Sequence, residues 1–522
     1  MKPQTTTWRF CMLRRMFAPV LLVACCFIAG CHSTSLARII REASEDVDLA
    51  RATFGQPSVV LEELSTVQQV VARQDAPPPH PRPLSPGGER GEGQFIDLTT
   101  ALQRAGFENP TLALAEEAVR ARLVEQTLVR GLLFPTLNAG MNLRVHHDAF
   151  LTGRGVAADV NLQSLYWGMG ADAKGGGTVA VPGLRLVGHL ADAFYAPQAV
   201  QQKVVQSQFD ASSTRLYVLM DVGIRYLALV EAHASLEAYR QSLKDFEEIE
   251  RLTLNFAQKG QGRDADAQRA KAETLLLRAE AQRAEEAIGT AGAELARLLD
   301  LDPAITLRPV DPMPSLLELV AREMSLRQLL DQALTNHPEI VARSADVAYQ
   351  EIRMRQERAR PFLPVIAVGF SAGEFGGSGP DTKSRLGHFV PRTDLDIVAV
   401  WSLQNLGQGN RAIQKLTRAE WESAQIEQTR VLDRIRREVV EGFTRTETYR
   451  AEILLARKRV ETSQRAYTQD LTRARNGQGR PLEVLSSASQ LSAARQSLIR
   501  AMIGYSQAQL QLYAALGNPT TR

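Results

Sequence analysis

Several kinds of residue are scarce in this chain, and each scarcity narrows its class. The four cysteines, Cys11, Cys25, Cys26 and Cys31, all lie within the first 31 of the 522 residues. The rest of the chain therefore has no disulfide and no thiol-based metal site. The 61 Lys and Arg nearly balance the 58 Asp and Glu, which leaves no electrostatic footprint for nucleic acid.

Long apolar runs are scarce as well. The run Met16–Ala29 is too short for an ordinary membrane span, and it follows Arg9, Arg14 and Arg15 as in a signal peptide. No later run reaches the length of a membrane helix, so entry into a membrane would require a barrel of strands. No catalytic motif stands out, and we expect no enzyme, no cofactor and no resident metal; the pattern at 146–148, His-His-Asp, is interpreted as a loop.

The apolar run ends at Cys31 in the segment Ile-Ala-Gly-Cys, which resembles a bacterial lipobox. We therefore predict a lipoprotein signal peptide over residues 1–30 and acyl chains on Cys31 that anchor the mature protein. Cys25 is the weaker alternative because cleavage there leaves a shorter apolar core. His32 stands where an aspartate often signals inner-membrane retention, which favours the outer membrane.

Residues 31–94 are expected to form a lipidated N-terminus and a tether. Their second half is rich in proline at 76–83 and in glycine at 87–91, a composition that buries no core. The structured body begins near Phe95.

One short phrase occurs twice in the body. The sequence Gly-Gln-Gly-Arg occurs at 260–263 and again at 477–480. Each copy interrupts a long, charged, alanine-rich run with helical periodicity. A tight turn with glycine between two helices makes an antiparallel hairpin. Pro110 and Pro338 lie in similar segments 228 residues apart, and Pro135 and Pro364 lie 229 apart. We infer an internal duplication, with a first repeat at 95–310 and a second at 311–522.

The helical periodicity predicts two unusually long helices, from about Pro197 to Lys259 and from about Arg411 to Arg475. Leu236 and Leu243 lie seven residues apart within the first, as in a heptad seam that needs a partner helix. A cytoplasmic coiled coil is the plain alternative, but the signal peptide and the duplication argue against it.

Period-two alternation predicts strands between the helices of each repeat. Apolar and polar residues alternate at 137–145, 366–370 and 394–403, and Val179–Leu190 is chosen as the remaining strand although Pro182 weakens it. Such strands fit either a half-buried sheet or a lipid-facing barrel. Four strands cannot close a barrel alone, so a barrel requires several chains. The predicted fold is mainly α, with a membrane β-barrel and a repeated helix–strand–strand–helix–helix unit.

Together these features resemble the TolC-like outer-membrane efflux channel family over about Phe95 to Pro519. The resemblance implies a homotrimer with a twelve-stranded barrel in outer-membrane lipid and a tunnel of long helices across the periplasm. It also implies a passive exit duct of a tripartite efflux or secretion system. Such a duct docks a periplasmic membrane-fusion adaptor and, through it, an inner-membrane pump.

The same resemblance suggests roles for the hairpin tips. The family pattern of a glycine followed by an acid, Val and Leu is matched after Gly477, whereas the first tip departs from it with Asp266-Ala267. Helix C-caps and solvated arginines remain the plain alternatives. The expected adaptor-docking residues are Gly260, Gly262, Arg263, Gly477, Gly479, Arg480, Val484 and Leu485, and the candidate gate residues are Asp264, Asp266 and Glu483.

A lipid-anchored periplasmic adaptor or helical scaffold without a pore is the rival interpretation. An adaptor normally has one hairpin flanked by compact β-rich domains. This chain has two predicted hairpins, with strands inside each repeat, which favours the channel.

Overall fold

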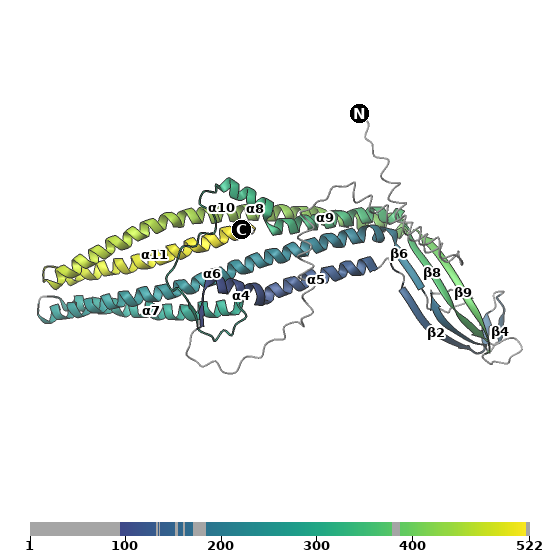
Figure 1. The fold of residues 1–522 in the computed structure, drawn as a ribbon, viewed down its shortest axis with the longest axis horizontal. Coiled ribbons are helices and arrows are strands. Elements are labelled where there is room, and N and C mark those ends of the chain that lie inside the picture. The colour runs from purple at the N-terminus through teal and green to yellow at the C-terminus, as the bar shows by residue number, and fades with distance from the viewer. Residues whose placement is uncertain are drawn as a thin grey trace, which may run out of the picture. The chain divides into compact units, whose positions relative to one another are not determined.

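A computed structural model of the chain describes residues 94–131, 134, 136–151, 155–159, 162–170, 184–260, 262–377 and 387–517. The predicted signal peptide, Cys31 and the tether lie outside these residues. The chain divides into units at 1–88 and 89–522, and the description below concerns the second unit alone. The described part of that unit is mainly helical, with one five-stranded sheet and two small two-stranded sheets (Figure 1).

A similar order of elements occurs twice along the chain. The first half contains α4 (Leu98–Glu108), α5 (Pro110–Gly131), β2 (Thr136–His146), β5 (Leu162–Gly170), β6 (Leu184–His189), α6 (Leu190–Gln258) and α7 (Asp264–Leu298). The second half contains α8 (Leu326–Asn336), α9 (Pro338–Ala359), β8 (Val365–Gly377), β9 (Gly387–Val400), α10 (Gln408–Arg475) and α11 (Pro481–Ala515). Shorter elements are β1 (Gln94–Ile96), β3 (Ala149–Leu151), β4 (Ala157–Asp159), β7 (Leu307–Pro309) and the 3₁₀ turns η1 (Arg360–Phe362) and η2 (Gln404–Gly407).

The two long helices begin slightly earlier than predicted, and α6 includes Pro197. A proline inside a helix removes one backbone hydrogen bond. Ala199 and Val200, directly after it, are only 2% and 7% exposed, so packing against neighbouring helices compensates for that loss. Tertiary burial therefore overrides the local signal to start the helix at the proline.

The sheet differs from the prediction at one strand position. Its order is β5-β2-β6-β8-β9, with a further pairing of β5 and β8. β6 pairs with β8 over Val365–Phe370, and β5 pairs with β8 over Ser371–Gly377. β2 pairs with both, so β5 and β6 together fill one position between β2 and β8. The prediction included the β6 part within Val179–Leu190 and missed β5, although Leu165, Trp167 and Met169 alternate there with Tyr166, Gly168 and Gly170.

β9 also ends sooner than predicted. Its last residue is Val400, so Trp401 and Leu403 lie outside the strand. Within the described residues, β2 and β9 each have one edge that no strand of this chain pairs.

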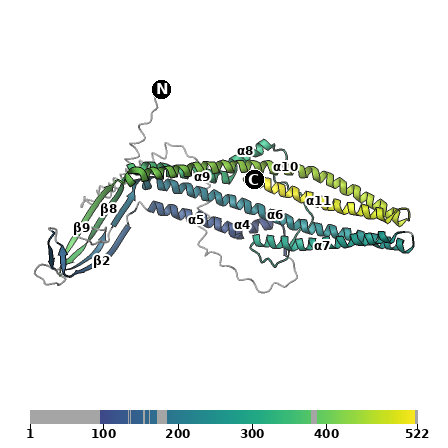
Figure 2. The ribbon, with the colours of Figure 1, turned by 180° about the vertical axis from the view of Figure 1, so that it is seen from behind.

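The helices lie side by side in two sets (Figures 1 and 2). Beside the sheet, the packing order is α5, α6, α9, α10, and towards the hairpin tips it is α7, α6, α11, α10. The short helices α4 and α8 pack on α6 and α10 respectively. None of the described helices combines the length and the apolar content that a membrane crossing requires.

An extended segment at residues 310–325, called the strap here, joins the two halves across α11. The Ser506 hydroxyl accepts from the Leu317 N–H at 3.3 Å, and the Gln509 amide oxygen accepts from the Val320 N–H at 3.0 Å. Ser506 and Gln509 are 0% and 2% exposed, so the strap satisfies polar groups that would otherwise be buried without partners.

Candidate functional site

The two hairpin tips share one backbone geometry. Gly260 and Gly477 both have a φ of +70°, a conformation that strains side-chain-bearing residues. In both tips the glycine N–H donates to the carbonyl three residues earlier at 3.0 Å. At the second tip the Gln478 N–H also donates to the Arg473 carbonyl at 2.9 Å, which completes a Schellman motif.

Close packing favours glycine at the second glycine position of each tip. A Cβ on Gly262 would lie 3.3 Å from the Phe256 Cβ, and one on Gly479 would lie 3.2 Å from the Arg473 Cβ. The repeated phrase thus encodes the same turn twice, although the residues after it differ.

The charged residues of the tips lie at the surface. Arg263 and Arg480 occupy the N-cap positions of α7 and α11, and neither side chain caps its helix. Asp264 and Glu483 are exposed in the first turns, where the positive end of the helix dipole favours carboxylates. Asp266 is half-buried and faces Arg269 at 3.5 Å. All three carboxylates therefore lie in the first turns of the helices that follow the tips.

Val484 and Leu485 do not meet the expectation of a docking surface. They are 1% and 7% exposed and belong to a core cluster that includes Phe246 and Ile249 of the other hairpin. Their burial follows from the helical period, because the face of α11 that carries them is the face packed on α6. These side chains hold the two hairpins together near their tips.

Polar ties join the same two hairpins. The Asp245 carboxylate lies 3.2 Å from an Arg495 guanidinium nitrogen. Nearer the tips, the Arg475 Nε donates to Glu248 at 3.1 Å. Burial raises the pKa of the Asp245 carboxyl, while Arg495 and Tyr467 oppose that rise. The sequence alone did not reveal these ties, because each pairs residues more than 200 positions apart.

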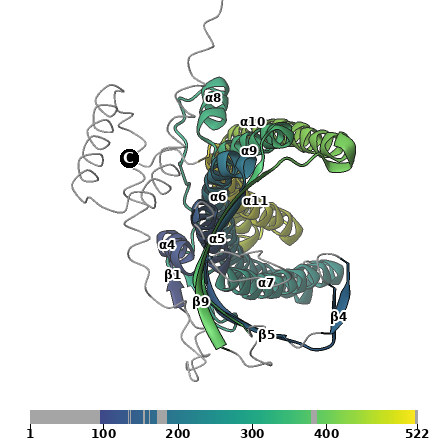
Figure 3. The same cartoon turned by 90° about the vertical axis from the view of Figure 1, so that its right-hand side faces the viewer.

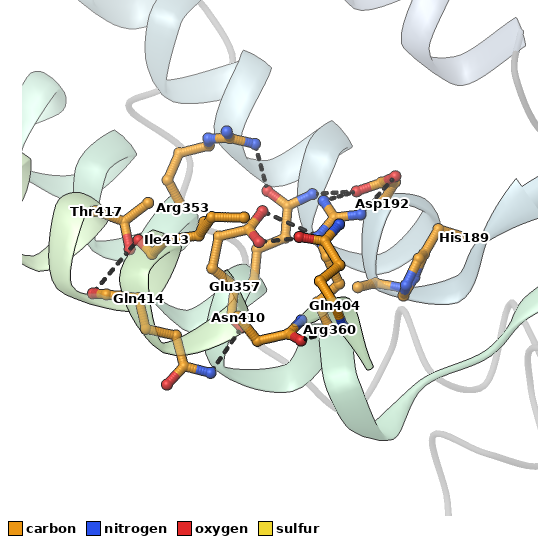
Figure 4. Close-up of polar contacts among 12 residues, drawn as sticks. His189, Asp192, Arg353, Glu357, Arg360, Gln404, Asn410, Ile413, Gln414 and Thr417 are labelled. Carbon is orange, nitrogen blue, oxygen red and sulfur yellow. Dashed lines mark hydrogen bonds and ion pairs between the residues drawn. The ribbon is translucent and has the colours of Figure 1, made fainter. Parts of the chain in front are cut away.

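A second polar cluster, called the junction network here, lies where the helices meet the sheet (Figure 4). Arg360 binds Asp192 of α6 at 2.5 Å and Glu357 of α9 at 2.9 Å. The Gln414 amide of α10 donates to the Glu357 carbonyl at 3.2 Å. Glu357 is 7% exposed, so its charge depends on Arg360. Burial alone would lower the pKa of the Arg360 guanidinium. Its hydrogen bonds and ion pairs with Asp192 and Glu357 outweigh burial and raise that pKa.

The arrangement indicates mechanical roles rather than chemistry. The junction network holds α6, α9 and α10 in register, and the polar ties hold the hairpins at the other end. Within the described ranges, no three His, Cys, Asp or Glu side chains gather as a metal-binding group would.

Comparisons with known proteins agree with this arrangement. Residues 329–518 match the family described as outer membrane efflux protein. The fold is similar to Vibrio cholerae VceC, with a TM-score of 0.67 and 16% identity over 80% of this chain and 96% of that one. It is also similar to the Campylobacter jejuni CmeC outer membrane channel, with a TM-score of 0.65 and 15% identity over 85% of this chain and 93% of that one.

A third similar structure is the open state of the Neisseria gonorrhoeae MtrE outer membrane channel. Its TM-score is 0.62, with 19% identity over 80% of this chain and 88% of that one. No curated protein sequence matches this chain. The structural neighbours are channels rather than enzymes. Residues 329–518 thus match the outer membrane efflux protein family, and the fold over both halves is similar to that of outer-membrane channels of known structure.

Proposed function

We propose that this protein is the outer-membrane channel of a tripartite efflux or secretion system. In this proposal three copies form a twelve-stranded barrel in the outer membrane, anchored by lipid on Cys31. Their helices form a periplasmic tunnel that docks a membrane-fusion adaptor and, through it, an inner-membrane pump. The observation that carries the proposal is the pair of unpaired sheet edges. Beside each of them lies an outermost helix with one side that no other helix of the same copy covers.

The open edges lie on opposite sides of the unit. β2 and α5 form one side, and β9 and α10 form the other. Unpaired strand edges seek a partner, and a head-to-tail contact between two different edges of one chain generates a ring when the rotation closes. Pairing β9 of one copy with β2 of the next would leave no open edge.

Exposed apolar side chains support the same contact between helices. Val124 on α5 is 69% exposed, and Leu416 on α10 is 59% exposed. Val124 lies seven residues from the sheet end of α5 at Gly131, and Leu416 lies eight residues from the sheet end of α10 at Gln408. The two side chains therefore stand at nearly the same depth, about 11 Å from the helix ends. Ring closure would cover both.

The hairpin tips supply the docking and gating ends of the proposed duct. The residues proposed to contact the adaptor are Gly260, Gly262, Arg263, Gly477, Gly479 and Arg480. The buried Val484 and Leu485 are excluded from this surface. Asp264, Asp266 and Glu483 are the proposed constriction, since three-fold symmetry would triple each charge. Opening would loosen the hairpins about the Asp245–Arg495 tie, with adaptor contact favouring the loosened state.

Single-channel conductance of the purified protein in a planar bilayer tests the proposal, with Glu483→Ala measured alongside. Small cation-selective steps that grow in the variant are expected. Steps that are the same in both proteins would move the constriction elsewhere. An absence of steps from well-folded trimers would refute the channel and favour a scaffold.

Engineered cysteines test the ring itself. Because the predicted mature chain keeps only Cys31, Val124→Cys with Leu416→Cys introduces one defined pair. Oxidation should give covalent dimers and trimers and no larger species. Val124→Cys with Leu455→Cys is the control, because Leu455 is 71% exposed but far along α10 from the sheet. Monomers alone, or an open-ended ladder, would contradict the ring.

A further inference from the structure

The turn η2, between β9 and α10, combines a strained backbone with an exposed apolar side chain. Asn405, Leu406 and Gly407 have φ values of +50°, +57° and +87°, so three successive residues are left-handed. Glycine tolerates this conformation and asparagine often adopts it, but it strains leucine. The Leu406 side chain is 93% exposed, so no packing within this chain offsets the strain.

The surrounding fold holds this turn in place. The Gln404 N–H donates to the Asn410 Oδ1 at 2.8 Å, and Asn410 is only 7% exposed. One helical turn later, the Gln414 amide donates to the Glu357 carbonyl of the junction network (Figure 4). Strain that the fold maintains in this way indicates a function. The exposed Leu406 side chain indicates that this function is a contact with a partner outside the chain.

The turn continues an apolar face of the sheet. Leu186, Val368 and Ile397 lie opposite one another across β6, β8 and β9, so their side chains share one face. Trp401 and Leu403 follow Ile397 at even spacing beyond the end of β9, and each is 61% exposed. Figure 3 views the unit from the sheet end, with the strands in front of the long helices. In the proposed barrel the apolar face would meet lipid, and the turn would lie at the edge of that lipid.

Unpaired positive charge lies directly after the turn. The first twelve residues of α10 contain three cations and no carboxylate, and one of the three, Arg418, pairs with Glu422 at 2.9 Å. No ion pair among the described residues involves the other two, Arg411 and Lys415. The carboxylates of the junction network are both bound by Arg360, so they do not neutralise these cations.

The two cations lie close to the turn and lean towards it. Arg411 and Lys415 are about 6 Å and 12 Å along the helix from Gly407. The Cα–Cβ bonds of a helix tilt towards its N-terminus, which for α10 is the end at the turn. The long apolar stems of arginine and lysine let the charged groups reach further in that direction. Exposed apolar groups and unpaired cations therefore gather at one end of α10.

We propose that this surface binds anionic phospholipid in the inner leaflet of the outer membrane. The segment Trp401–Gly407 enters the boundary between headgroups and acyl chains, and Arg411 and Lys415 contact the lipid phosphates. Transfer of the Leu406 side chain from water to lipid offsets the strain in its backbone. The inference rests on the proposed function, because only an outer-membrane protein would present this end to that leaflet.

Quenching of Trp401 fluorescence by brominated lipids tests the proposal. Trp8→Phe, Trp167→Phe and Trp421→Phe together leave Trp401 as the one tryptophan of the chain. This parent protein, in full length, is reconstituted into phosphatidylcholine vesicles. The vesicles contain a fixed minor fraction of either brominated phosphatidylglycerol, which is anionic, or brominated phosphatidylcholine, which has no net charge.

Variants of the parent protein separate the two parts of the surface. Arg411→Gln with Lys415→Gln removes the two charges beside the turn. Its matched control is Arg457→Gln with Lys458→Gln, which removes two exposed cations of α10 more than 70 residues of helix rise away in ångströms, at about 73 Å from the start of the helix. Leu406→Asn removes the apolar group and keeps a residue that accepts the left-handed backbone.

Both brominated lipids should quench Trp401 in the parent protein. The anionic lipid should quench more strongly, with an enrichment beside Trp401 of about fivefold for each of the two cations. The charge variant should lose this preference, whereas its control should keep it. Leu406→Asn should lower the quenching by both lipids. Circular dichroism and trimer content establish that each variant is folded.

Equal quenching by the two lipids in the parent protein would overturn the binding of anionic lipid. Absence of quenching in folded trimers would overturn the lipid contact altogether, because a neighbouring copy would then cover the turn. Unchanged quenching in Leu406→Asn would overturn the insertion of Leu406. Bilayer conductance of the same preparations separates the two proposals. Conducting steps without lipid-dependent quenching refute only the lipid surface, whereas an absence of steps refutes the channel.

Discussion

Acidification should weaken the helical part of this protein through one buried histidine. His337 lies between α8 and α9 and is 0% exposed. Its Nδ1 accepts from the Glu339 N–H at 3.2 Å, so the ring must be neutral with its proton on Nε2. Nε2 has no hydrogen-bond partner among the described residues, which leaves no acceptor to stabilise a charged ring.

The magnitude follows from the pKa. Burial, which is the largest cause, and the nearby charge of Arg434 lower the pKa of His337 from 6.5 to about 4, against the opposing effect of Glu339. Between these values the unfolded chain binds the proton and the folded chain does not. Stability should therefore be fully present above pH 6.5 and fall as the pH drops towards 4. The free energy of unfolding should decrease by about 3 kcal/mol, because each unit of pKa difference between the folded and unfolded states contributes about 1.4 kcal/mol.

The reference variant is His337→Asn, because the corresponding position of the first half is Asn109. There the Asn109 side chain accepts from the Thr111 N–H at 2.8 Å and donates to the Leu298 carbonyl at 2.8 Å. Asparagine can thus cap the same helix without titrating. Urea unfolding followed by far-UV circular dichroism, at several pH values for each protein, measures the difference.

As the pH drops from 6.5 towards 4, the free energy of unfolding of the wild type should decrease by about 3 kcal/mol more than that of His337→Asn. Tyr217, Glu339, Arg434 and Glu438 surround this region, and they are common to both proteins. Their titration therefore cancels in the comparison. Parallel pH profiles would refute the assignment of this acid sensitivity to His337.

Three further predictions concern the tips, the junction network and the polar ties. Gly477→Ala should lower stability by about 1 kcal/mol because of its positive φ, whereas Gly289→Ala within α7 should raise it by a similar amount; thermal melts that rank them the other way would contradict this. Arg360→Met should cost about 3 kcal/mol by leaving Glu357 buried without its partner, and Arg360→Met with Glu357→Gln should recover part of that in urea unfolding; no recovery would argue against the pair. Asp245→Asn should loosen the hairpins and increase single-channel conductance, an effect that Arg495→Gln should reproduce without adding to it in the double variant; additive effects would mean that the two residues act separately.

The sequence alone was sufficient where structure depends on neighbouring residues. Both tips lie where the repeated glycine phrase predicted them, because a positive φ and a helix-ending hydrogen bond are local properties. The long helices end within a residue or two of the predicted positions for the same reason. Asp264 and Glu483 are exposed because they lie in the first turns of helices at the surface.

Only the tertiary structure decided how distant segments combine. β5 and β6 share one strand position because both pair with β8, and the alternation within a strand does not say which distant strand it pairs with. Val484 and Leu485 are buried because the second hairpin packs on the first. The junction network joins side chains from three separate segments. Long-range packing and burial, which no local pattern encodes, place these groups together.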